Sequence, residues 1–108
     1  KQIYLEKPIA VTVADACAVV EAAKRAPNIV QMVGFNYRFN PLLQDLRQKL
    51  AQNVVGQLTA IRSNFTVPAI NPLPDWKKQA ATGGGALLDL ASHHIDLLRY
   101  LSGVEIVK

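Results

Sequence analysis

The spacing of apolar and polar residues predicts a strand, a helix and a second strand at the start of the chain. Residues 2–5 are a short apolar run typical of a buried strand, and residues 13–25 have the alanine-rich spacing of a helix. Thr12 suits the N-cap of this helix, with Asp15 completing a capping box. Residues 29–33 form a second apolar run, so these segments predict a parallel βαβ unit with a right-handed crossover.

After residue 40 the pattern predicts an α+β arrangement, which makes this point the expected domain boundary. Asn40 and Pro41 suit the N-cap and first position of a helix that runs to about residue 52. Residues 56–67 alternate as a half-buried strand does, and residues 68–82 contain three prolines and no periodicity, which predicts a long loop. A glycine triplet precedes a helix expected over residues 86–101, and residues 104–107 begin another strand.

Composition narrows the class of protein. Half of the 108 residues are hydrophobic, and the formal charge of +4 comes from scattered lysines and arginines, so we expect no nucleic-acid partner. The single cysteine, Cys17, excludes an internal disulfide and is predicted to be a small core residue. Neither a membrane-length apolar run nor a signal-peptide pattern is present, which favours a cytoplasmic location. The first residue, Lys1, leads directly into a strand, and we expect further sequence upstream.

The helix over residues 86–101 contains the strongest candidates for chemistry. At 100° per residue, Asp89, His93, Asp96 and Tyr100 share one narrow stripe, whereas His94 falls among leucines and is predicted to be a core histidine. An imidazole one turn from a carboxylate suits general acid/base catalysis. The alternative interpretation is a solvated helix face. Two possible ligands are too few for a metal, and we expect none.

Two other features allow both a functional and a structural interpretation. The turn Gly83-Gly84-Gly85 could hold an anion at a helix start or could simply be close-packed, and it lacks the spacing of the dinucleotide fingerprint. Lys7 stands at the carboxyl end of the first predicted strand, where open α/β sheets bind ligands. It could therefore be a positioned cation or an ordinary surface lysine.

Three motifs occur in an order that resembles a known family. Glu6-Lys7-Pro8 resembles an E-K-P motif, residues 34–41 (GFNYRFNP) resemble G-x-x-x-R-F-x-P, and residues 84–96 resemble G-G-x-x-x-D-x-x-x-H-x-x-D. Together they resemble the glucose–fructose oxidoreductases, inositol dehydrogenases and MocA-like proteins over essentially the whole chain. The resemblance implies that residues 1–40 end a Rossmann-type dinucleotide-binding domain. Residues 41–108 would begin a substrate-binding and dimerisation domain with helices packed on a largely antiparallel sheet.

The resemblance implies an NAD(P)-dependent oxidoreductase that acts on a CH–OH group of a sugar, inositol or related polyol. The glycine fingerprint and the later strands of the family are missing from the sequence, so this chain alone is expected to be inactive, and NAD or NADP would be bound mainly by the missing upstream segment. We expect homo-oligomers through the substrate-domain sheet, and self-association of the isolated chain through the edge strand 56–67. A non-catalytic ligand sensor and an NAD-assisted glycoside-cleaving relative remain alternatives.

The resemblance also implies residue roles. Lys7 would stabilise a developing alkoxide, His93 would exchange the hydroxyl proton, and Asp89 would bind a substrate hydroxyl and orient His93. The expected cofactor contacts are Glu6, Lys7, Pro8, Asn36, Tyr37 and Arg38. The expected substrate contacts are Lys7, Asp89, His93, Asp96 and Trp76. The resemblance further suggests a cis peptide bond between Lys7 and Pro8.

Overall fold

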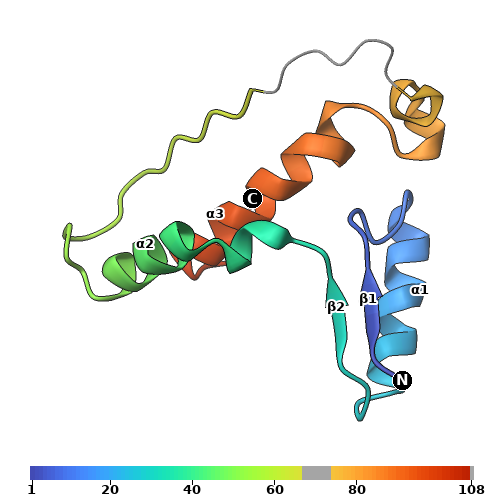
Figure 1. Cartoon of the computed structure of the whole chain (residues 1–108), viewed down its shortest axis with the longest axis horizontal. Helices are drawn as coiled ribbons and strands as arrows, with labels where there is room; N and C mark the ends of the chain where they lie inside the picture. The colour runs from blue at the N-terminus through green and yellow to red at the C-terminus, as the bar shows by residue number, and fades with distance from the viewer. Residues whose placement is uncertain (67–73, 108) are drawn as a thin grey trace. The chain divides into compact units, whose positions relative to one another are not determined.

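The computed structural model describes residues 1–66 and 74–107. Its elements, in chain order, are β1 (Ile3–Leu5), α1 (Val13–Lys24), β2 (Gln31–Val33), the 3-10 helix η1 (Asn36–Phe39), α2 (Pro41–Ala51), the 3-10 helices η2 (Asp75–Lys78) and η3 (Ala80–Thr82), the π-helix η4 (Leu87–Ala91) and α3 (Ser92–Ser102) (Figure 1). They form two compact units. The first unit combines residues 1–35 with the described part of 71–92, and the second combines the described parts of 36–70 and 93–108.

The first unit contains the strand–helix–strand arrangement that the sequence predicted. Strands β1 and β2 pair in parallel, with Ile3 opposite Gln31 and Leu5 opposite Val33. Helix α1 connects them (Figure 1), and the side-chain amide of Gln31 donates to the carbonyls of Ala23 and Ala26 near the end of that helix. Because parallel strands direct their carboxyl ends to the same edge, the residues that follow β1 and β2 emerge together.

Both predicted N-caps are confirmed. The Thr12 hydroxyl oxygen accepts from the Asp15 N–H at 3.1 Å, and the Asn40 side-chain oxygen accepts from the Leu42 N–H at 2.9 Å. Each bond satisfies an N–H group that has no carbonyl partner in the first turn of a helix. Helix α2 then ends at Ala51, one residue before the predicted end.

Two predicted strands are wrong in the described part of the chain. Residues 56–66 run as an irregular exposed segment (Figure 1), and residues 104–107 are likewise not a strand; residue 67 lies outside the described residues. A strand satisfies its backbone groups by pairing with a neighbour, and no described segment supplies one here. The predicted loop over 68–82 contains η2 and η3 in its described part, while residues 68–73 lie outside the described residues.

The helix predicted over residues 86–101 has two parts, the π-helix η4 and the α-helix α3. A constant turn of 100° per residue therefore does not hold over residues 87–91, because a π-turn closes between residues five apart. Within this helical segment Leu101 and Asp96 are the buried residues. Leu101 belongs to the predicted apolar stripe, but Asp96 does not.

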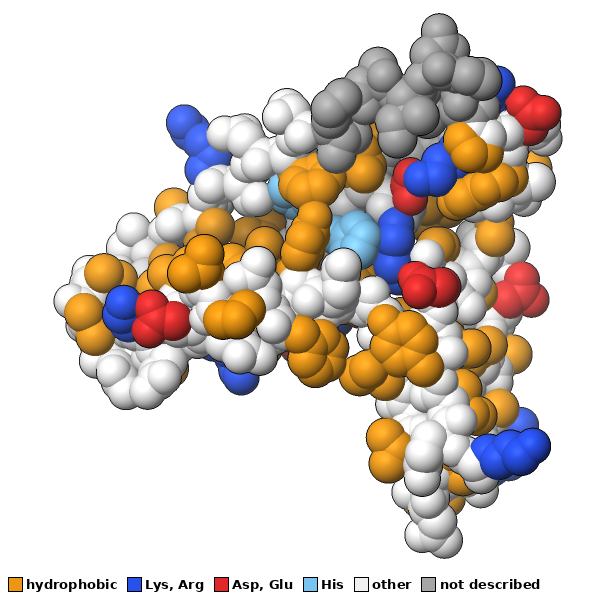
Figure 2. Space-filling model, in the orientation of Figure 1, with side chains coloured by type: hydrophobic (Ala, Val, Ile, Leu, Met, Phe, Trp, Pro, Cys, Tyr) orange, Lys and Arg blue, Asp and Glu red, His pale blue; other side chains and the backbone are white. Residues whose placement is uncertain are grey.

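Many apolar side chains remain exposed, as Figure 2 shows for the hydrophobic groups over both units. None of the residues of α1 is buried. Cys17, predicted to be a core residue, is accordingly exposed. The alanine-rich surroundings of Cys17 indicated a helix correctly, but they do not determine which of its faces is covered. Of the described helices, none has both the length and the apolar character that crossing a membrane requires.

Candidate functional site

In the first unit, two lysines contact one carboxylate. Lys7 is the second residue after β1, and its ammonium donates to Oδ1 of Asp89 at 2.9 Å and also to the Asp89 backbone carbonyl. Lys77, from η2, donates to the other carboxylate oxygen, Oδ2, at 2.9 Å. The side chains of Lys7 and Asp89 are only 12% and 20% exposed, so this contact is largely shielded from water. We call these three residues the lysine–aspartate cluster.

The charges of this cluster favour the ionised form of Asp89. The hydrogen bond from Lys77 and then the one from Lys7 lower the pKa of the Asp89 carboxyl, and these effects outweigh the partial burial that raises it. An ionised carboxylate accepts hydrogen bonds and cannot donate them. Asp89 is therefore suited to bind a hydroxyl or ammonium group.

Lys7 stands at the carboxyl edge of the parallel strands. The Lys7–Pro8 peptide bond is cis, as the resemblance suggested. At the same edge, Gly34 directly follows β2, and its N–H donates to the Leu5 carbonyl at 2.8 Å. The interpretation of Lys7 as a positioned cation is favoured over an ordinary surface lysine, because its side chain is 12% exposed and donates to two oxygens of Asp89.

The glycine triplet is a close-packed turn. A Cβ at Gly84 would lie 2.5 Å from the backbone oxygens of both Trp76 and Lys77, so only glycine fits there without displacing η2. The backbone N–H groups of the triplet already donate within the first unit: Gly83 to Ala80, Gly84 to Gln79 and Gly85 to Lys77, at 3.1, 2.9 and 3.1 Å. These three N–H groups are therefore already used and cannot also bind an anion, which argues against the anion-binding interpretation of the turn.

In the second unit, the two adjacent histidines contact different aromatic rings. The His93 ring lies 5.1 Å, centroid to centroid, from that of Tyr37. His94 lies 5.2 Å from the ring of Phe65, and its Nδ1 is 2.8 Å from the Ser63 hydroxyl. His94 is half-buried and hydrogen-bonded. It is therefore a packing histidine, although less enclosed than the predicted core position.

Arg38 and Asp96 form a two-point ion pair in the second unit. The guanidinium donates from Nε to Oδ2 at 2.8 Å and from Nη2 to Oδ1 at 2.6 Å. Asp96 is 4% exposed, so the alternative of a solvated helix face is wrong for this residue. The Arg38 guanidinium lies 5.5 Å from the Tyr100 ring, and that of Arg47 lies 4.6 Å from it. These contacts join η1, α2 and α3.

The predicted site residues are thus divided between the two units. Lys7 and Asp89 are in direct contact in the first unit, which also contains Glu6, Pro8 and Trp76. Asn36, Tyr37, Arg38, His93 and Asp96 belong to the second unit. Sequence reasoning missed Lys77, since nothing in its spacing links it to Asp89. The only signal that the sequence offered was its position next to Trp76. In the structure, the Trp76 ring lies 5.2 Å from the Lys77 ammonium.

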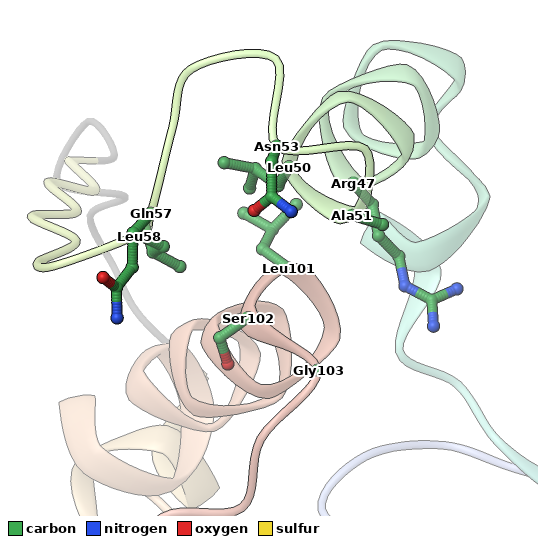
Figure 3. A pocket seen from close by; sticks show the side chains of 9 residues that line it. All are labelled: Arg47, Leu50, Ala51, Asn53, Gln57, Leu58, Leu101, Ser102 and Gly103. Atoms are coloured by element: carbon green, nitrogen blue, oxygen red, sulfur yellow. The ribbon is translucent and has the colours of Figure 1, made fainter.

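The second unit also contains a cavity of about 380 Å³ (Figure 3). Its lining residues come from α2, the segment that follows it and the end of α3: Arg47, Leu50, Ala51, Asn53, Gln57, Leu58, Leu101, Ser102 and Gly103. None of these is a predicted site residue. Over residues 1–66 and 74–107, no group of three or more histidine, cysteine, aspartate or glutamate side chains is arranged to hold a metal ion.

Comparisons with known proteins give the chain its family. The model of the GFO/IDH/MocA C-terminal domain matches residues 43–108. A levoglucosan dehydrogenase from Pseudarthrobacter phenanthrenivorans is 36% identical over 95% of this chain and 27% of that protein. A myo-inositol 2-dehydrogenase from Thermotoga maritima is 30% identical over 98% of this chain and 30% of that protein.

The similarity extends to solved structures. An oxidoreductase domain protein from Kribbella flavida matches with a TM-score of 0.78 at 33% identity, over 98% of this chain and 29% of that one. The chain belongs to the GFO/IDH/MocA family, as the three sequence motifs indicated. It spans between a quarter and a third of the length of the curated relatives described above.

Proposed function

We propose that this chain is a segment of an oxidoreductase that transfers hydride between NAD or NADP and a CH–OH group of a sugar, inositol or related polyol. The observation that carries this proposal is the contact between Lys7 and Asp89 at 2.9 Å. It joins the E-K-P motif to the aspartate of the helix motif, across 82 positions of sequence. The names of the relatives, levoglucosan dehydrogenase and myo-inositol 2-dehydrogenase, support the substrate class.

The residues at the carboxyl edge of β1 and β2 fit a nicotinamide cofactor. Ligands of parallel α/β sheets bind beyond the carboxyl ends of the strands, and Lys7 is fixed at that edge by Asp89. Glu6, Lys7 and Pro8 would contact the cofactor there, and Asn36, Tyr37 and Arg38 would contribute from the second motif. When bound, the cofactor supplies the hydride acceptor or donor.

The roles of the protein groups follow from their charges and proton-transfer chemistry. The Lys7 ammonium stabilises negative charge on the substrate oxygen as its proton leaves. His93 accepts that proton during oxidation and returns it during reduction. The ionised Asp89 accepts a hydrogen bond from a neighbouring substrate hydroxyl and orients His93. Asp96 and Trp76 complete the proposed set of substrate contacts.

We further propose that protomers of the complete protein associate through a largely antiparallel sheet of the substrate-binding domain. In residues 56–66, the large apolar side chains Leu58, Ile61 and Phe65 are each 38% exposed, which leaves apolar surface for contact with another part of the complete protein.

The test is a turnover assay on the complete purified protein. NAD⁺ and NADP⁺ would each be offered with myo-inositol, scyllo-inositol and levoglucosan, and formation of reduced nicotinamide would be followed by absorbance. We expect turnover with at least one pair and its loss in Lys7→Met. Lys24→Met is the matched control, because its ion pair with Glu21 is exposed and belongs to α1. Polyol binding by calorimetry without any turnover would instead support a ligand sensor.

A further inference from the structure

We propose that Lys77 is a positioning residue for the reaction, one that orients Asp89 and keeps the lysine–aspartate cluster positively charged. This inference rests on the proposed function and extends it to a residue that none of the three sequence motifs contains. Lys77 reaches Oδ2 of Asp89 at 2.9 Å, while Lys7 occupies Oδ1 at the same distance. Two donors on two oxygens fix the plane of the carboxylate, whereas one donor would let it turn.

The charge balance of the cluster gives Lys77 its importance. Lys7 and Asp89 alone would form a neutral pair, and a neutralised ammonium stabilises a developing alkoxide poorly. Lys77 adds a second positive charge, so the three groups together carry a net charge of +1. The cluster then retains positive charge for the substrate oxygen even though Asp89 is ionised.

The backbone around Lys77 is held in place. The Lys77 carbonyl accepts from the Gly85 N–H at 3.1 Å, and the Trp76 carbonyl accepts from the Thr82 hydroxyl at 2.8 Å. Gly84 allows this close approach because it has no Cβ. Together with the Trp76 ring, which lies 5.2 Å from the Lys77 ammonium, these contacts restrict where a long side chain can reach.

The neighbouring residue provides a natural contrast. Lys78 also pairs with an aspartate, Asp75 at 3.1 Å, but the side chains of that pair are 49% and 89% exposed. Exposed pairs of this kind contribute little to stability. Lys7 and Lys77 are the charged groups that hydrogen-bond to the Asp89 carboxylate among the described residues, and Lys78 is not one of them.

The experiment compares Lys77→Met, Lys77→Gln and Lys77→Arg with the control Lys78→Met in the complete protein. We expect kcat to fall roughly 10- to 100-fold in the Met and Gln variants, less than the loss of a donor that contacts the oxyanion directly. KM should change little. The acidic limb of the profile of kcat against pH should move to higher pH, because Asp89 is harder to ionise without Lys77. Arg should restore most of kcat, because it retains the charge and can still donate to a carboxylate.

A second measurement does not depend on turnover. The Asp89 carboxyl would be titrated by ¹³C NMR in the wild type, Lys77→Gln and Lys78→Met, and we expect a higher midpoint in Lys77→Gln alone. If the wild type is inactive while this midpoint still moves, the proposed function fails but the control of Asp89 by Lys77 stands. An active wild type in which Lys77→Gln retains kcat, the pH profile and the Asp89 midpoint would overturn the inference.

Discussion

Arg38 donates to both carboxylate oxygens of Asp96, and the two side chains differ sharply in exposure. Asp96 is almost completely buried, whereas the Arg38 side chain is 41% exposed. The hydrogen bonds that Arg38 donates to Asp96 raise the pKa of the Arg38 guanidinium. The pair contributes to stability because Asp96 is buried: its carboxylate has lost its hydrogen bonds to water, and those from the Arg38 guanidinium replace them.

We therefore predict that Arg38→Gln destabilises the complete protein by about 2 kcal/mol. Removing one partner of a fully buried pair costs about 3–5 kcal/mol, and water reaching Asp96 through the vacated space reduces that figure. The midpoint of urea unfolding measures the change. Glu105→Gln, which breaks the exposed pair between Arg99 and Glu105, is the control and should leave the midpoint nearly unchanged. Equal shifts in the two variants would contradict the structural role of the Arg38–Asp96 pair.

The pKa of Asp89 predicts how stability changes with pH. Lys77 and Lys7 lower this pKa in the folded protein below its ordinary value of 3.8. The resulting stabilisation is complete above the ordinary value and is lost as the pH falls through the folded-state pKa. The difference in unfolding free energy between the wild type and Asp89→Asn should therefore be constant near neutral pH and shrink in acid.

Unfolding by urea at a series of pH values checks this expectation. Asp75→Asn serves as the comparison, because the Asp75 side chain is 89% exposed and its pair with Lys78 is solvated. It should change the free energy of unfolding much less than Asp89→Asn at neutral pH. A difference for Asp89→Asn that does not depend on pH would show that the lysines do not stabilise its ionised form.

The two histidines should respond differently to substitution. We predict that His93→Ala lowers turnover of the complete protein by ~10²–10⁴-fold, as expected for loss of a general acid/base. His94→Ala should instead cost about 1 kcal/mol of stability, because it removes the hydrogen bond with Ser63 and the contact with Phe65. Steady-state kinetics and urea unfolding of both variants separate these effects. Small and equal losses of turnover would count against the role proposed for His93.

Two neighbouring glycines test the close-packed turn. Gly84→Ala places a methyl group 2.5 Å from backbone oxygens of η2 and should cost about 1–3 kcal/mol, as overpacking does. Gly85→Ala meets no atom within 4 Å but has a φ of +95°, so its cost is backbone strain of about 1–2 kcal/mol. Turnover should fall more in Gly84→Ala, because displacement of η2 carries Lys77 away from Asp89. Unfolding and kinetic measurements on both variants test this, and a turnover loss confined to Gly85→Ala would refute it.

The sequence predicted those parts of the fold that depend on local chemistry. Thr12 and Asn40 gave the starts of α1 and α2, because capping involves residues only two or three positions apart. The strand predicted over residues 56–67 was wrong in its described part, because an alternating pattern is a local signal whereas a strand also requires a partner. The π-helix also escaped prediction, because the spacing of apolar residues does not distinguish one extra residue in a turn.

The candidate site was predictable only where a motif marked it. Lys7 and Asp89 were both expected to be catalytic, but their direct contact depends on tertiary folding over 82 positions. Lys77 is brought to Asp89 by the packing of the glycine turn against η2, which no periodicity reveals. Asp96 was expected to contact substrate or solvent, and its ion pair with Arg38 required the second unit to fold.

The ring of Tyr100 has a further consequence for how the second unit opens. Its contacts with Arg38 and Arg47 join η1 and α2 to α3, so none of these helices can move away without breaking a contact with the same side chain. Segments joined in this way tend to open as one cooperative group, which slows exchange of their amide hydrogens together. Residues 57–66, exposed and outside any helix or strand, should exchange first. The second unit would thus contain a slowly exchanging group of helices beside a rapidly exchanging segment.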